Sequence, residues 1–115
     1  MKLTLPYPAK ELWPNSRPHY LAKNREAKKL RTYVHWAVKE QAGSIKLANG
    51  PIRWKITVCP KTYGPPPDRD NAVSAAKSIL DGIADALGVN DRHFAAPVVE
   101  ISRERTSKFI VEVGE

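Results

Sequence analysis

The sequence predicts an α/β domain of the α+β kind, with the element order β-α-β-α-β-β and two helices packed on a mixed sheet. Three observations lead to this fold class. Two stretches repeat apolar residues at helical spacing, and short runs around them alternate apolar and polar residues as strands do. The chain has 115 residues and is 42% hydrophobic, which suffices for one domain over residues 1–115 with a modest core.

The first part of the chain is expected to contain a short strand, a loop and a basic helix. Residues 3–5 alternate and predict a strand that ends at Pro6, and four prolines make residues 6–18 an ordered loop. Residues 23–41 carry an apolar stripe on one side and cations on the other. This pattern predicts an amphipathic helix that ends at Ala42-Gly43.

The middle of the chain is expected to add a strand and a second helix. After a turn at Asn49-Gly50, residues 52–59 alternate as a half-buried strand, and residues 60–67 form a proline-rich connection. Residues 71–87 predict one continuous helix with a wide apolar face. That face serves either the core alone or the core and a partner subunit.

Two further strands are expected at the end of the chain. Residues 97–103 and 109–113 have the composition and alternation of strands. A tight turn near Thr106-Ser107 is expected to join them.

Positive charge is concentrated in the first third of the chain. Residues 1–40 contain nine Lys or Arg against three Glu, a net of +6 out of +7 for the whole chain. Such a field suits a polyanion, most commonly nucleic acid, although a basic surface kept for solubility is the alternative. Trp36 lies among these cations, where it stacks on a base or packs against a neighbouring loop. The cations expected to bind DNA phosphates are Lys10, Arg17, Lys23, Arg25, Lys28, Lys29 and Arg31.

The single cysteine and the hydropathy pattern indicate a cytoplasmic protein. Cys59 cannot form an intrachain disulfide and reads as a small core residue in a reducing compartment. Apolar runs stay well below the roughly 18 to 20 residues of a membrane span, and no signal-peptide pattern opens the chain.

An acidic motif precedes the second helix of this basic protein. Asp68 and Asp70 lie at the helix start, and Asp91 lies just after its end. One aspartate at such a place is ordinarily a helix cap, but one helix needs only one cap. Two carboxylates about 5 Å apart repel by roughly 3 kcal/mol at an effective dielectric near 20. A bound cation offsets this repulsion, and oxygen ligands favour Mg²⁺ or Mn²⁺.

The spacing along this helix adds a lysine to the acidic motif. At 100° per residue, Asp70, Lys77 and Asp81 lie within about 40° of one another on one helix face. Helical side chains lean toward the N-terminus, so Lys77 is expected to reach back toward Asp70. The alternative for Lys77 is an i,i+4 ion pair with Asp81, and both contacts are compatible if Asp81 orients the lysine.

These motifs together resemble the RusA family of Holliday junction resolvases, many of them encoded by phages and prophages. The resemblance covers most of the chain. Its least specific parts are the Leu-Pro-Tyr-Pro opening, the Pro14-Asn15-Ser16-Arg17 segment followed by Tyr20, and the basic helix. Its most specific part is Asp68-Arg69-Asp70-Asn71, followed by a helix with Lys77 and Asp81 and then by Asn90-Asp91.

The resemblance implies a homodimeric, Mg²⁺-dependent enzyme that nicks four-way DNA junctions symmetrically. It implies that Asp68, Asp70 and Asp91 are metal ligands and that Lys77 is the catalytic lysine. Two positions depart from the family pattern. Ser74 stands where many members have the lysine, and Asn90 stands where the first acid of the late pair is found.

The function expected from the residues and the resemblance is metal-dependent cleavage of branched DNA in recombination and repair, with no membrane partner. A non-catalytic, basic DNA-binding protein whose aspartates are helix caps is the main alternative. A metal-dependent enzyme acting on a nucleotide or nucleotide-sugar is a second one, although the sequence shows no glycine-rich phosphate loop.

Overall fold

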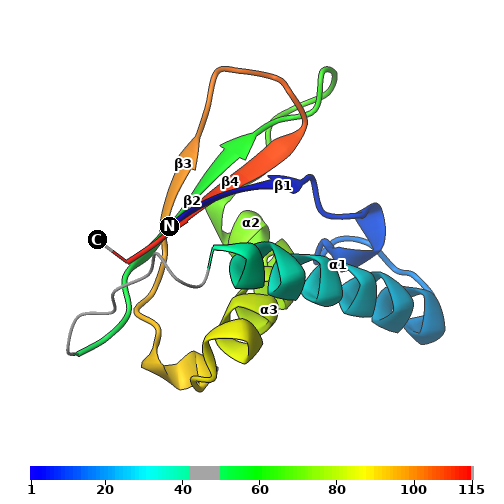
Figure 1. The fold of residues 1–115 in the computed structure, drawn as a ribbon. Coiled ribbons are helices and arrows are strands. Elements are labelled where there is room, and N and C mark those ends of the chain that lie inside the picture. The colour runs from blue at the N-terminus through cyan, green and yellow to red at the C-terminus, as the bar shows by residue number, and fades with distance from the viewer. Residues whose placement is uncertain (42–49, 115) are drawn as a thin grey trace.

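All three α-helices pack against the same face of the β-sheet (Figure 1). The computed structural model describes residues 1–41 and 50–114. The strands are β1 (Lys2–Pro6), β2 (Trp54–Cys59), β3 (Val98–Ile101) and β4 (Lys108–Val113). The helices are η1 (Lys10–Leu12), α1 (Tyr20–Glu40), α2 (Arg69–Ala75), α3 (Lys77–Leu87) and η3 (Asp91–His93), where η marks a short 3-10 helix. The prediction of a single α+β domain with a mixed sheet is confirmed.

The sheet has the order β1-β4-β2-β3. β4 is antiparallel to both β1 and β2, whereas β3 is parallel to β2. A parallel neighbour requires a crossover connection, and α2 and α3 supply it between β2 and β3. Met1 and Val113 exchange hydrogen bonds of 2.8 and 2.9 Å, which places the two ends of the described chain side by side (Figure 1).

The prediction that a tight turn joins the last two strands is wrong. β3 and β4 both pair with β2 and lie on opposite sides of it, so residues 102–107 cross from one edge of β2 to the other. Ser102 donates to the Val58 carbonyl and Ser107 donates to the Pro60 carbonyl, and these bonds hold the crossing segment against the end of β2.

The second expected helix is divided in two at Ala76. The backbone of Ala76 has ψ near 4°, and its amide donates to the carbonyls of both Ala72 and Val73, at 3.0 and 3.1 Å. The break leaves α3 beginning at Lys77, so this lysine lies at a helix start. The apolar face of the two helices is used largely within the chain, since Ile79 and Ile83 are fully buried.

The core lies between the sheet and the helices. α1 contributes Leu30, Val34 and Val38, and the sheet contributes Ile56 and other alternating strand residues, as predicted. Gly82 allows α1 and α3 to approach closely. A Cβ atom at Gly82 would lie 2.6 Å from the Arg31 carbonyl oxygen and 2.9 Å from the Val34 Cβ.

The remaining element boundaries differ modestly from expectation. α1 begins three residues earlier than predicted and ends at Glu40, while the expected helix end at Ala42-Gly43 and Asn49 of the expected turn lie outside the described residues. Ile52 forms an isolated bridge with Phe94 ahead of β2. Cys59 is buried, which confirms its place in the core. Within the described residues, no helix is both long and apolar enough to cross a membrane.

Candidate active site

Lys77 forms the centre of an exposed group of charged side chains. Its ammonium donates to the Asp81 carboxylate at 3.0 Å and to the Asp91 carboxylate at 2.8 Å. Asp81 lies one turn along α3, so this contact is the i,i+4 pair expected from the spacing. Asp91 comes from the separate segment η3, and its contact depends on the chain turning back after α3.

The turn that brings Asp91 to Lys77 begins at Gly88. This residue has a positive φ of 68°, a left-handed conformation that glycine adopts at little cost, and it ends α3. The Asn90 side chain then accepts from the Arg92 amide at 3.0 Å and caps η3, whose first residue is Asp91. Asn90 therefore positions Asp91 through a local cap, a role that its place in the sequence motif did not reveal.

The two contacts keep Lys77 and Asp91 charged. The hydrogen bond from Lys77 to Asp91 is the largest of the effects that raise the pKa of Lys77, and the bond to Asp81 is the second. The same ammonium lowers the pKa of Asp91. A lysine with a raised pKa is a poor proton acceptor at neutral pH but a fixed positive charge, which suits the stabilisation of a phosphate.

Asp68 and Asp70 lie at the start of α2. Asp68 is the N-cap residue and its backbone carbonyl accepts from the Ala72 amide at 3.0 Å, yet its carboxylate makes no capping hydrogen bond. Asp70 lies in the first turn. Both side chains are exposed, and neither carboxylate has a hydrogen-bond or ion-pair partner among the residues that the structure describes. The Asp68 side chain therefore does not cap α2, although capping is the ordinary explanation of an aspartate at this place.

The described residues do not gather three acidic, histidine or cysteine side chains closely enough to hold a metal ion. Asp91, expected to join Asp68 and Asp70, instead pairs with Lys77, and Lys77 does not reach back to Asp70. The physical reason is that the ammonium of Lys77 offers Asp91 an opposite charge within the chain. Mg²⁺ commonly takes one or two protein carboxylates, and the unpartnered carboxylates Asp68 and Asp70 fit that demand.

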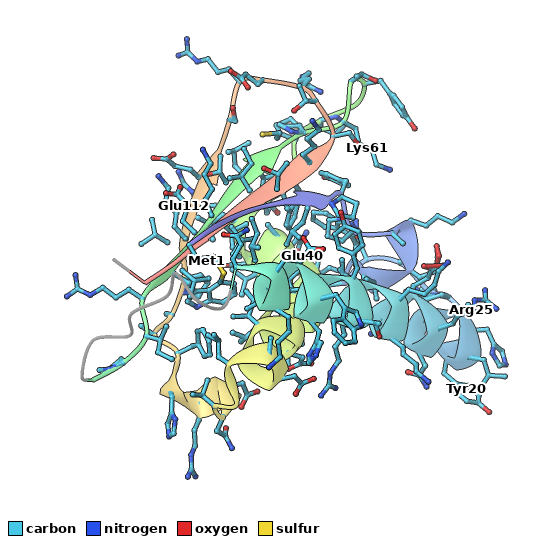
Figure 2. All side chains as sticks on the ribbon, in the orientation of Figure 1. Met1, Tyr20, Arg25, Glu40, Lys61 and Glu112 are labelled. Carbon is cyan, nitrogen blue, oxygen red and sulfur yellow. The ribbon has the colours of Figure 1, made fainter. Side chains whose placement is uncertain are left out.

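The basic residues expected to bind DNA are spread over η1, the loop that follows it and α1. Figure 2 shows Tyr20 and Arg25 at the start of α1 and Glu40 at its other end. Two of the predicted cations are neutralised within the described chain: Lys29 pairs with Glu26 at 3.4 Å, and Arg31 pairs with Asp85 at 2.6 Å. Of the predicted DNA-binding cations, those without an ion-pair partner in residues 1–41 and 50–114 are Lys10, Arg17, Lys23, Arg25 and Lys28.

A groove of about 630 Å³ lies between α1 and α3 and is lined by Lys28, Trp36, Asp81 and their neighbours. Trp36 is 62% exposed, and its ring meets the His35 ring edge-on, with centroids 5.1 Å apart. Packing of Trp36 against a loop is therefore wrong for the described part of the chain. Asp81 belongs both to this groove and to the Lys77 contacts, so the groove adjoins the candidate site.

A comparison with models of known protein families finds no match. The sequence is 33% identical to an uncharacterized protein of Xylella fastidiosa (strain Temecula1 / ATCC 700964). The alignment covers 96% of this chain and 74% of that protein. At this identity and coverage, the chain belongs to the same family as the Xylella protein.

Proposed function

We propose that this protein is a metal-dependent endodeoxyribonuclease that nicks branched DNA, with the four-way junction as its substrate. The observation that carries the proposal is the contact of Lys77 with both Asp81 and Asp91. Only Ala76 separates the helix that begins with Lys77 from the helix that begins beside Asp68 and Asp70. The RusA-like motif therefore lies on the consecutive helices α2 and α3. Asp91, the acid that follows them in the sequence, contacts Lys77.

Lys77 has the properties required of an electrostatic catalyst. Two carboxylates hold its ammonium in place and favour its charged form, so it remains positive where a phosphodiester gains negative charge in the transition state. Both partners are partly exposed, and exposed ion pairs are weak, so a DNA phosphate can displace Asp91 from Lys77 at little cost. Asp81 then keeps the lysine oriented.

Asp68, Asp70 and Asp91 would hold Mg²⁺, with Mn²⁺ as a substitute. Once bound, the ion supplies Lewis-acid stabilisation of the phosphate and lowers the pKa of a coordinated water. Asp68 and Asp70 are available because no group in the described residues occupies them, and Asp91 becomes available when it leaves Lys77. The proposed metal site thus groups three acids in a protein whose net charge is +7.

The cations on η1 and α1 would supply sequence-independent affinity for DNA by contacting phosphates. A four-way junction has two-fold symmetry, so symmetric nicking requires two active sites, and a C2 homodimer supplies them. The single buried Cys59 is compatible with action in the reducing cytoplasm.

A non-catalytic, basic DNA-binding protein is the rival function, and the lack of a three-acid group in the described residues favours it. Replacing Asp70 with Asn distinguishes the two functions on a labelled synthetic four-way junction. The nuclease should retain junction binding in this variant and lose Mg²⁺-dependent nicking, whereas Glu104→Gln, an exposed loop acid, should nick like the wild type. The rival predicts binding without nicking for all three proteins, with Mg²⁺ or Mn²⁺.

A further inference from the structure

A second pocket, of about 530 Å³, lies beyond the ends of β1 and β2 and reaches Asp68. We call it the Lys61 pocket. Lys10 and Lys61 supply positive charge to its lining, and Asn15, Ser16 and Asn71 supply polar groups. Three successive prolines, residues 65–67, form the wall that leads to Asp68. The pocket therefore joins two lysines and three hydrogen-bonding side chains to an acid of the candidate active site.

The aromatic wall of the Lys61 pocket is fixed to the core. Tyr7 and Trp13 stack with ring centroids 5.2 Å apart, and both meet the fully buried Phe109 edge-on, at 5.4 and 5.9 Å. The Trp13 indole also donates to the Pro8 carbonyl at 3.1 Å. This wall cannot collapse into the pocket without breaking core contacts, so the pocket is preformed.

The loop that carries Lys61 is held from outside the pocket. Arg105 donates through Nη1 to the carbonyls of Lys61 and Gly64, both at 2.9 Å. The Lys61 ammonium lies 5.6 Å from the centroid of the Tyr7 ring, a cation–π distance. Figure 2 shows Lys61 where the chain leaves β2. Lys61 is thus positioned by its backbone and by an aromatic face, and no carboxylate in the described residues neutralises it.

The charge distribution separates this pocket from the groove between α1 and α3. In the groove, Arg31 is neutralised by Asp85 and Asp81 is neutralised by Lys77. In the Lys61 pocket, two unpaired lysines face a single acid, Asp68. The groove keeps one unpaired cation, Lys28, so the Lys61 pocket offers an anion two unpaired ammonium groups against one in the groove.

We propose that the Lys61 pocket binds the sugar-phosphate backbone of DNA at a phosphate next to the one that is cut. Lys61 and Lys10 contact that phosphate. The phosphate that is cut lies on the side of the pocket where Asp68 is found. The proposal rests on the proposed nuclease function. It adds Lys61, which lies in the proline-rich connection, to the residues that contact the substrate.

The first test compares Lys61→Gln with Lys39→Gln, which removes the same charge at the far end of α1. Lys39 lies near Gln41, which donates to the Lys2 carbonyl at the start of β1, whereas the pocket lies beyond the end of β1. The Arg105 bonds use the Lys61 backbone, so Lys61→Gln keeps the loop in place. Binding to a labelled four-way junction is measured in EDTA, where nicking cannot occur, over a range of salt concentrations.

Loss of one phosphate contact should weaken junction binding by roughly fivefold and reduce the slope of log K against log salt by about 1. Lys39→Gln should leave both quantities near the wild-type values.

The second test scans a single neutral methylphosphonate linkage along the cut strand. At one position near the nick the neutral linkage should weaken wild-type binding and should not weaken Lys61→Gln further, because the contact is already absent.

The outcomes separate this inference from the proposed function. If the wild type never nicks DNA but Lys61→Gln shows the selective loss of affinity, the nuclease function fails and the pocket remains a DNA phosphate site. If the wild type nicks junctions but Lys61→Gln equals Lys39→Gln in affinity, salt slope and methylphosphonate response, the pocket assignment is overturned and the nuclease function stands.

Discussion

Lys77 and Asp91, fourteen residues apart in the chain, meet in a 2.8 Å ion pair that joins the start of α3 to η3. The contact depends on the left-handed turn at Gly88 and on the Asn90 cap. It joins two candidate site residues that lie in separate segments of the sequence.

Removing Asp91 should lower the pKa of Lys77 more than removing Asp81 does. The bond to Asp91 is the largest effect that raises the pKa of Lys77, and the bond to Asp81 is the second. NMR titration of the Lys77 side chain in Asp91→Asn and Asp81→Asn measures both changes. Equal pKa values in the wild type and Asp91→Asn would show that the two groups do not interact in solution.

The same pair predicts how stability depends on pH. The pKa of Asp91 is lowered on folding, so its contribution is present above the ordinary carboxyl pKa of about 3.9 and is lost as the pH falls through the folded value. The pKa of Lys77 is raised, so its contribution is complete below about 10.4 and is lost as the pH rises through the folded value. The melting-temperature difference between wild type and Asp91→Asn should therefore be constant near neutral pH and should shrink in strong acid and strong base.

Mg²⁺ should stabilise the wild type through Asp68 and Asp70. Without metal, Asp68→Asn or Asp70→Asn should raise the melting temperature, because each removes one of two neighbouring negative charges. Adding Mg²⁺ should raise the melting temperature of the wild type more than that of either variant, since only the wild type keeps every ligand. Glu104→Gln, in an exposed loop, serves as the charge-matched control and should respond to Mg²⁺ like the wild type. A uniform response in all four proteins would contradict a metal site at these acids.

Gly82→Ala should destabilise the protein, although alanine favours helices over glycine by about 1 kcal/mol. The added Cβ would lie 2.6 Å from the Arg31 backbone oxygen, which no side-chain rotation can relieve, so α1 and α3 must separate. Overpacking of this kind costs about 1 to 3 kcal/mol. Thermal or urea unfolding should show a net loss of up to about 2 kcal/mol. A raised stability would mean that the two helices do not pack this closely.

The parts of the fold that the sequence predicts correctly are those that local periodicity determines. The alternation of residues 52–59 and the apolar stripe of residues 23–41 report which side of each element is buried, and both elements form. The break at Ala76 is invisible in this periodicity because the apolar stripe continues across it. The pairing of β3 and β4 was also beyond local reasoning, since each strand pairs with β2 instead of with the other.

In the candidate site too, local contacts could be predicted from the sequence and non-local contacts could not. The i,i+4 spacing of Lys77 and Asp81 predicts their contact directly. The contact with Asp91 requires the backbone geometry at Gly88, and the Lys61 pocket requires two segments, residues 7–16 and 61–71, that are far apart in the sequence. Lys61 itself carried only a weak signal, a lysine directly after Pro60 in a proline-rich connection.

Strand-resolved mapping of nicks on a synthetic four-way junction tests the nuclease proposal most directly. With Mg²⁺, the wild type should place one nick in each of two opposing strands, and EDTA should abolish both nicks. Asp91→Asn should bind the junction with little change in affinity, Lys77→Ala should bind it roughly fivefold more weakly because one phosphate contact is lost, and both should leave its strands intact. A wild-type protein that binds the junction tightly, yet cuts no strand with either Mg²⁺ or Mn²⁺, would contradict the proposal.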